Sequence, residues 1–162
     1  IPWLCVCVPS HWAPEDKLGK SLAAIHGPVA DGAALGAAMP ALTRLLADGG
    51  HWERFVWTIT PSGRYDQHPR RHPRLPWPDA PDPAEFAARC FLRAERQTFL
   101  PVPGRQQVVF TIRVMLQPLA QAVQSPQQAA RLHDSLASMT PEVLQYKNLS
   151  GARAALLAWL AA

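Results

Sequence analysis

The chain has 162 residues, of which 48% are hydrophobic and 17% are charged, a composition typical of one globular domain with a core and not of a disordered segment. No apolar run approaches the roughly 20 residues that a membrane helix needs, so we expect no association with a membrane. The net charge of +4 is modest and lies largely in Arg70, Arg71 and Arg74, without the interleaved aromatic residues of a nucleic-acid-binding surface.

The opening residues 3–8 (WLCVCV) predict a short apolar strand. Neither a helix cap nor a signal peptide precedes this run, so we expect one domain, residues 1–162, that lacks its N-terminal part. Cys5, Cys7 and Cys90 are an odd set without the spacing of metal ligands. A strand would place Cys5 and Cys7 on one face, and we expect buried free thiols in a reducing, cytoplasmic compartment.

The middle of the first half alternates between helical and extended patterns. Residues 14–20 (PEDKLGK) predict a short helix, because a proline suits the first turn and acidic residues follow it. Residues 33–47 carry apolar side chains at helical spacing and are followed by a Gly-Gly pair. Residues 53–60 (ERFVWTIT) predict a strand. Residues 61–83 hold seven of the 17 prolines and predict a long surface loop, either a lid or a connector.

Residues 90–100 and 107–116 predict two further strands, and the PVPGRQ segment between them predicts a hairpin. After the hairpin the pattern becomes helical, with caps followed by apolar residues at helical spacing. The predicted caps are Ser125, Thr140 and Ser150. Strands followed by helices favour an α+β fold with a mainly antiparallel sheet, to which residues 53–60 would also belong.

Six histidines are candidates for metal binding. His26 stands out because it follows the apolar run LAAI and precedes a Gly-Pro pair. A neutral imidazole there can bind a metal through one nitrogen if a hydrogen bond holds the other, although a buried histidine bonded to backbone carbonyls fits the same pattern. His68 and His72 lie among prolines that forbid a helix, so we expect a solvated basic loop. The remaining three suit loop or surface positions: His11, His51 and His133.

The predicted hairpin carries charged side chains whose arrangement depends on its register. One register sets Glu95 opposite Arg113 as a cross-strand ion pair. The other places Arg96 and Arg113 on one face, where two close guanidinium groups need an anion between them. Ordinary exposed sheet charge, worth less than about 1 kcal/mol, is the simpler interpretation. Arg93 lies on the opposite face from Arg96, and we expect it to tolerate alanine.

Three segments resemble one known family in order and spacing. They are VPSHWAPEDKLGKSLAAIHGPV at 8–29, FLRAERQTFLPVPGRQQVVFTIRVMLQPL at 91–119, and MTPEVLQYKNL at 139–149. Together they are similar to the characteristic blocks of the haem-dependent oxidative N-demethylases over residues 8–160. The resemblance departs at CVCVPS, where a more aromatic run is expected, and family members usually carry about a hundred residues before this point.

The resemblance implies a PAS-like haem domain that oxidises a secondary amine such as dimethylamine to a primary amine and formaldehyde. It implies haem b as the cofactor, with O₂ as oxidant and electrons from NADPH through flavin and iron–sulfur components of a reductase partner. By the resemblance, His26 matches the axial ligand of the iron. Arg96 and Arg113 would hold haem propionates or line a polar distal pocket, Arg113 with a catalytic role, and Glu95 would hold the substrate ammonium.

A PAS-like module that senses haem or a small ligand without turnover would carry the same segments and is the alternative. Aromatic faces can also bind an ammonium, and the candidates are Trp3, Trp52 and Trp57, for which core packing is the simpler expectation.

The sequence contains no glycine-rich phosphate loop, no G-x-S-x-G and no CxxC pair. Nucleotide-binding, serine hydrolase and zinc-finger functions therefore have no support.

Overall fold

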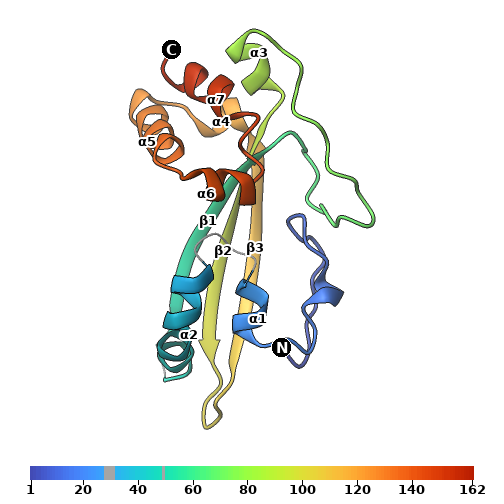
Figure 1. The fold of residues 1–162 in the computed structure, drawn as a ribbon, viewed down its shortest axis with the longest axis vertical. Helices are drawn as coiled ribbons and strands as arrows, with labels where there is room; N and C mark the ends of the chain where they lie inside the picture. The colour runs from blue at the N-terminus through green and yellow to red at the C-terminus, as the bar shows by residue number, and fades with distance from the viewer. Residues whose placement is uncertain (28–31, 49) are drawn as a thin grey trace.

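A three-stranded antiparallel sheet with the order β1-β2-β3 runs along the length of the molecule (Figure 1). The strands are β1 (Trp52–Thr60), β2 (Phe91–Pro101) and β3 (Val108–Pro118). This computed structural model describes residues 1–27, 32–48 and 50–162. The sheet confirms the predicted strands and their antiparallel hairpin. Alternating side chains along β2 supply two faces with different chemistry, and both bear on the candidate site.

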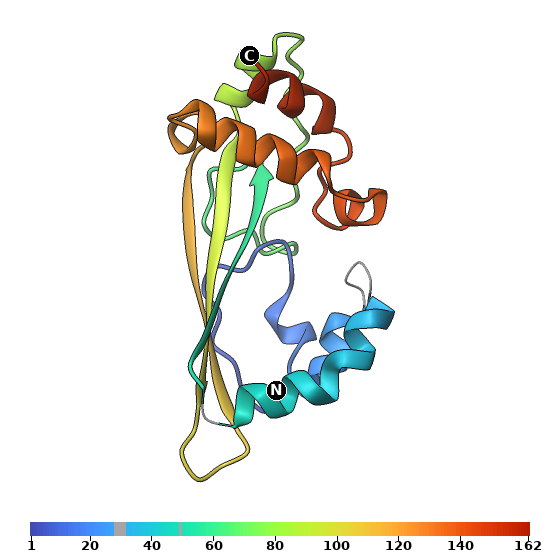
Figure 2. The same ribbon diagram turned by 90° about the vertical axis from the view of Figure 1, so that its left-hand side faces the viewer.

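The N-terminal helices lie near one end of the sheet and the C-terminal helices near the other. The first group comprises the short 3₁₀ turn η1 (Pro14–Asp16), α1 (Leu22–His26) and α2 (Gly32–Ala47). The predicted helix over 33–47 is confirmed, whereas the helix over 14–20 shrinks to the single turn η1. Figure 2 shows α2 and α6 extending to the same side of the sheet.

The second group consists of α3 (Pro83–Ala88), α4 (Leu119–Ala122), α5 (Pro126–Ala137), α6 (Pro141–Tyr146) and α7 (Arg153–Leu160). The predicted caps at Ser125 and Thr140 are confirmed, because their side chains accept from the backbone N–H groups three residues later. The cap at Ser150 was wrong, since α7 begins at Arg153. The main core lies between these helices and the sheet, where its members include Ile59, Leu119, Leu136, Leu149 and Leu156.

The first ten residues depart from the prediction. Residues 3–8 form no strand. The strand-like pairing of the N-terminal residues is an isolated parallel bridge that follows them, between Ser10 and Gln67. Cys90 is buried as expected, but Cys5 and Cys7 are exposed. Apolar composition predicted a buried strand, yet a strand also needs a neighbour with which to pair, and the described residues supply none there.

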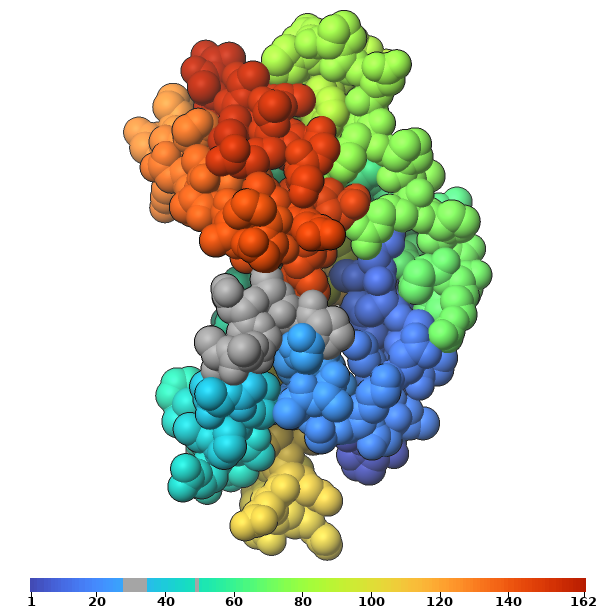
Figure 3. Space-filling model, in the orientation of Figure 1, coloured from blue at the N-terminus to red at the C-terminus, as the bar shows by residue number. Residues whose placement is uncertain are grey.

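The proline-rich segment is a connection without helix or strand until α3 begins, as expected. It is less exposed than its composition suggested. Gln67 and His68 are only 2% and 3% exposed, because the segment lies against the N-terminal residues (Figure 3). Within the described ranges, no helix has both the length and the apolar character of a membrane span.

Candidate functional site

The register of the hairpin separates the charged residues that the sequence singled out. Arg96 lies directly opposite Arg113, and Glu95 lies opposite Val114. The structure therefore has the register that places the two arginines on one face, and the ion pair between Glu95 and Arg113 is excluded. Because adjacent residues of a strand point to opposite faces, Glu95 and the two arginines lie on opposite sides of the sheet.

The arginine face carries an internal counter-ion. Arg96 Nε donates to Glu53 Oε2 of β1 at 2.6 Å, and Arg96 Nη2 lies 2.6 Å from the same oxygen; both side chains are exposed. An exposed pair of this kind stabilises a protein by about 0.2–1 kcal/mol. Arg113 is exposed, and within the described part of the chain no carboxylate pairs with it. Glu53 lies on β1, on the side of Arg96 away from Arg113, so it neutralises Arg96 and is not an anion between the two arginines.

The other face carries a continuous polar network centred on Glu95. Glu95 Oε1 accepts from Ser10 Oγ at 2.5 Å, and Oε2 accepts from Gln97 Nε2 at 2.8 Å. Gln97 Oε1 in turn accepts from Arg54 Nε at 2.7 Å. Both oxygens of the half-buried carboxylate are thereby fixed in position. The alternation of β2 could have identified Gln97, but no local signal could have placed Ser10, which is 85 residues away from Glu95.

Arg93 joins this network through Ser10 and is only 1% exposed. Its Nε donates to Ser10 Oγ at 2.6 Å, its Nη2 to Val8 O at 3.0 Å, and its Nη1 to Arg64 O at 3.3 Å. Burial lowers the pKa of Arg93, and the charge of Glu95 opposes that effect. The expectation that Arg93 would tolerate alanine does not fit these contacts, because one side chain ties two distant segments to the sheet.

The end of α6 reaches the same region. Lys147 Nζ donates to the carbonyl of Trp57 at 2.6 Å and lies 5.5 Å from the centre of the Trp57 ring. Burial lowers the pKa of Lys147, and the charge of Glu95 opposes that effect. Trp57 is partly buried against the core, as expected. Core packing was also predicted for Trp3 and Trp52, and this prediction is wrong, because both are exposed. The Trp57 ring therefore already has a cation as its neighbour.

His26 is the last residue of α1 and is half-buried. Its Nδ1 lies 2.8 Å from the carbonyl oxygen of Leu22, so Nδ1–H donates to that carbonyl and Nε2 keeps a lone pair. Metal-binding histidines commonly show this arrangement, in which a backbone carbonyl fixes the tautomer and the orientation of the ring. Among the described residues, no three His, Cys, Asp or Glu side chains form a metal cluster. A single histidine of this kind fits a haem, whose porphyrin supplies the other ligands.

His68 is not the solvated loop residue that the sequence predicted. Its Nε2 lies 3.1 Å from Glu15 Oε2, and its Nδ1 accepts from the backbone N–H of Arg70 at 3.2 Å. Glu15 also accepts from Arg70, and these bonds hold the pKa of Glu15 at about 2. With both ring nitrogens engaged, His68 has no lone pair for a metal. His72 lies 3.5 Å from Asp66.

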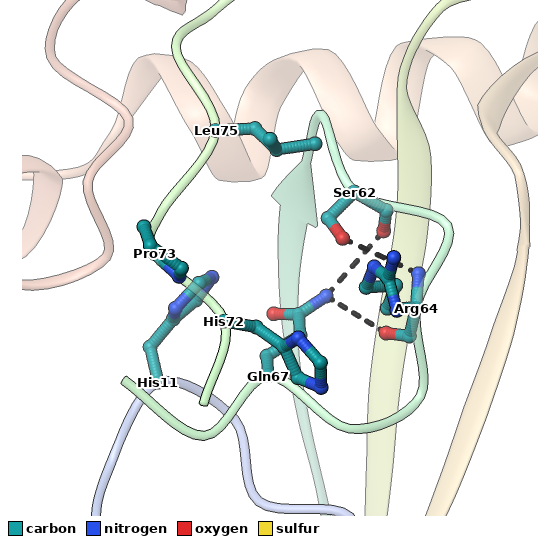
Figure 4. A pocket seen from close by; sticks show the side chains of 7 residues that line it. All are labelled: His11, Ser62, Arg64, Gln67, His72, Pro73 and Leu75. Atoms are coloured by element: carbon teal, nitrogen blue, oxygen red, sulfur yellow. Dashed lines mark hydrogen bonds between the residues drawn. The ribbon is translucent and has the colours of Figure 1, made fainter. Parts of the chain in front are cut away.

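A cavity of about 180 Å³ lies beside the network (Figure 4). Its lining residues are His11, Ser62, Arg64, Gln67, His72, Pro73 and Leu75. Small-molecule and cofactor pockets commonly measure about 300–1,000 Å³, so this cavity does not fit a haem. A second hollow, of about 430 Å³, lies between α5 and the C-terminal residues. Neither of these two cavities is lined by His26 or Glu95.

Comparison with protein families identifies one family over most of the chain. The model of a family described as "Haem-dependent oxidative N-demethylase, alpha subunit-like" matches residues 4–157. The match includes α1 with His26, the whole hairpin with Glu95, Arg96 and Arg113, and α6. It thus spans nearly the full chain, from the N-terminal segment that carries Ser10 to α7. The chain therefore belongs to the family of haem-dependent oxidative N-demethylase alpha subunit-like proteins.

Proposed function

We propose that this chain is a haem-binding oxygenase domain that removes a methyl group from a secondary amine such as dimethylamine. The products would be a primary amine and formaldehyde, and the electrons would come from NADPH through flavin and iron–sulfur components of a partner in the cytoplasm. Family membership supports the haem and the class of reaction. The observation that carries the proposal is the bond between His26 Nδ1 and Leu22 O, which leaves Nε2 available as a ligand.

In this proposal His26 Nε2 would hold the iron of a haem b, within an arrangement of sheet and helices that we propose to be PAS-like. When bound, the haem would supply the activation of O₂ by two electrons. The protein would contribute the imidazole ligand and its orientation. The carbonyl of Leu22 fixes the imidazole through Nδ1–H, and a partner of this kind also raises the basicity of the ligand.

Glu95 is the residue that we propose for the substrate. An alkylamine is protonated at neutral pH, as a lysine side chain is with its pKa of about 10.4, so it needs a carboxylate in a partly dry site. A carboxylate can accept about four hydrogen bonds, and Ser10 and Gln97 occupy one position on each oxygen of Glu95. A secondary ammonium has two N–H donors, which match the acceptor capacity that remains.

The roles of Arg96 and Arg113 toward haem propionates remain predictions. The position of the two arginines allows these roles only if the propionates reach the face of the sheet opposite Glu95. Both lie on the face of the sheet opposite Glu95, and Arg96 is paired with Glu53. On the Glu95 face, Arg54 is an exposed cation that uses Nε for Gln97. We propose Arg54 for a propionate if the haem lies on that side, because the rest of its guanidinium can still donate.

Oxygen consumption tests this function. The full-length protein, loaded with haem and supplied with NADPH and its reductase, should consume O₂ when dimethylamine is added. One formaldehyde should form for each O₂, because the second oxygen atom leaves as water with two electrons and two protons. A protein that binds dimethylamine, shown by a change in the haem spectrum, without amine-dependent O₂ uptake would be a sensor and would contradict the proposal.

A further inference from the structure

The cavity beside the Glu95 network has the character of a separate binding site (Figure 4). Its wall consists of His11 from the N-terminal segment and residues 62–75 from the proline-rich segment. Two backbone bonds join these segments: His11 N–H donates to Gln67 O at 3.1 Å, and Gln67 N–H donates to Pro9 O at 3.0 Å. Ser10 bonds Glu95, whereas its neighbour His11 lines the cavity, so the two sites are adjacent but distinct.

Gln67 presents a buried acceptor without a partner. Its Nε2 donates to the carbonyls of Ser62 at 3.4 Å and Arg64 at 3.1 Å, and these two acceptors fix which end of the amide is nitrogen. Within the described chain, Oε1 is buried and has no hydrogen-bond partner. Figure 4 shows this oxygen pointing away from Ser62 and Arg64. Buried acceptors are nearly always satisfied, so an occupant with a donor group is expected there.

His11 occupies its position at the expense of backbone strain. Its φ is 57°, in the left-handed region that favours glycine, and strained residues of this kind cluster at functional sites. No described side chain or backbone group bonds its ring. Partial burial, followed by the charges of Arg74 and Arg93, lowers the pKa of His11 to about 4. At neutral pH the ring therefore offers one N–H donor and one lone pair.

The charges around the cavity favour an anion. Arg64 lines it, and the effects of Arg74 and Arg93 on His11 indicate a positive potential. In the described ranges, no carboxylate contacts the buried guanidinium of Arg93 directly. The nearby Asp66 accepts from Arg71 at 2.9 Å and 3.0 Å. A cationic ligand would meet repulsion here, whereas an anion would add a counter-charge.

We propose that this cavity binds a small oxyanion that carries a hydroxyl group, the chemistry shared by hydrogenphosphate, bicarbonate and short hydroxycarboxylates. The hydroxyl donates to Gln67 Oε1, and the charged oxygens accept from the His11 N–H and from Arg64, the arginine that lines the cavity. The volume of about 180 Å³ restricts the occupant to few non-hydrogen atoms, since ordinary ligand pockets begin at about 300 Å³. This site does not depend on the proposed N-demethylation.

The test is titration of the full-length protein, at neutral pH, with phosphate, bicarbonate and glycolate in separate experiments. The readouts are the ¹H–¹⁵N signals of the His11 ring and calorimetry, and the anion with the tightest saturable binding identifies the source. Acetate and chloride, which lack a hydroxyl donor, should bind at least about tenfold more weakly, because Gln67 Oε1 then stays unpaired. Dimethylammonium should not bind this cavity.

Two variants and a control complete the design. His11→Gly should abolish the ring contacts while the melting temperature stays equal or rises, because glycine relieves the strain. Gln67→Glu should weaken binding at least about tenfold by adding a negative charge beside the anion. His133→Ala on α5 should bind like the wild type. If none of the three anions shifts the His11 signals, or if binding survives His11→Gly unchanged, the proposal is wrong.

Discussion

Replacing Arg93 with alanine should lower the free energy of unfolding by about 2–5 kcal/mol, the range found when a large buried side chain is truncated to alanine. The change leaves the carbonyl of Val8 without its side-chain donor and the carbonyl of Arg64 with Gln67 Nε2 alone, and it removes the guanidinium that holds Ser10 toward Glu95. It also opens a cavity in a region where the native side chain is almost fully buried. Equilibrium unfolding in urea, followed by tryptophan fluorescence, measures the loss.

Arg113→Ala is the matched control, because it removes the same side chain from the neighbouring strand at an exposed position. It should change the free energy of unfolding by no more than about 0.5 kcal/mol. Arg93→Lys should recover only part of the loss, since an ammonium cannot reach three acceptors with the fixed geometry of a guanidinium. Equal effects of the two alanine substitutions would show that Arg93 does not anchor the N-terminal segment.

Glu95→Gln should lower kcat/KM for dimethylamine by about 10- to 100-fold, which corresponds to the loss of a charge-assisted hydrogen bond of about 1.5–3 kcal/mol. The amide keeps the size of the side chain and can still accept from Ser10, so the fold should persist. Haem content and melting temperature should stay near those of the wild type. Steady-state O₂ uptake against amine concentration measures the effect, which should fall mainly on KM.

Glu53→Gln provides the corresponding control on the other face of the sheet, where the carboxylate binds Arg96 in solvent. It should leave kcat/KM unchanged and alter stability by at most about 1 kcal/mol. A fall in kcat/KM for Glu53→Gln that matched the fall for Glu95→Gln would place the substrate on the arginine face and would return Arg96 and Arg113 to the site.

Local sequence patterns predicted most of the fold. The period of two along β1, β2 and β3, and the caps at Ser125 and Thr140, are properties of neighbouring residues, and these elements formed where expected. The register of the hairpin stayed open between two solutions, because a slip of one residue preserves the alternation while it exchanges the faces. Only the structure placed Arg96 opposite Arg113.

Contacts between distant segments could not be predicted. The burial of Arg93 and His68 depends on how residues 8–15 and 64–70 meet at the sheet, and charged residues are almost never fully buried unless paired. Composition therefore assigned both side chains to solvent. The predicted strand over 3–8 failed for a related reason, since apolar composition does not reveal whether a pairing partner is present. His26 could be selected from its context, but its bond to Leu22 appears only in three dimensions.

The most direct test of the central claim is titration of the full-length apoprotein with haemin, followed by the Soret absorption. The wild type should bind one haem per chain with a spectrum of histidine ligation. Loss of a residue that merely orients a metal ligand lowers affinity by about 10- to 100-fold. His26→Ala removes the ligand itself, so its affinity for haem should fall by at least that factor, and added imidazole should restore the Soret band. His51→Ala, at an exposed position, should bind as the wild type does. An unchanged spectrum and affinity in His26→Ala would contradict the assignment of His26 as the axial ligand.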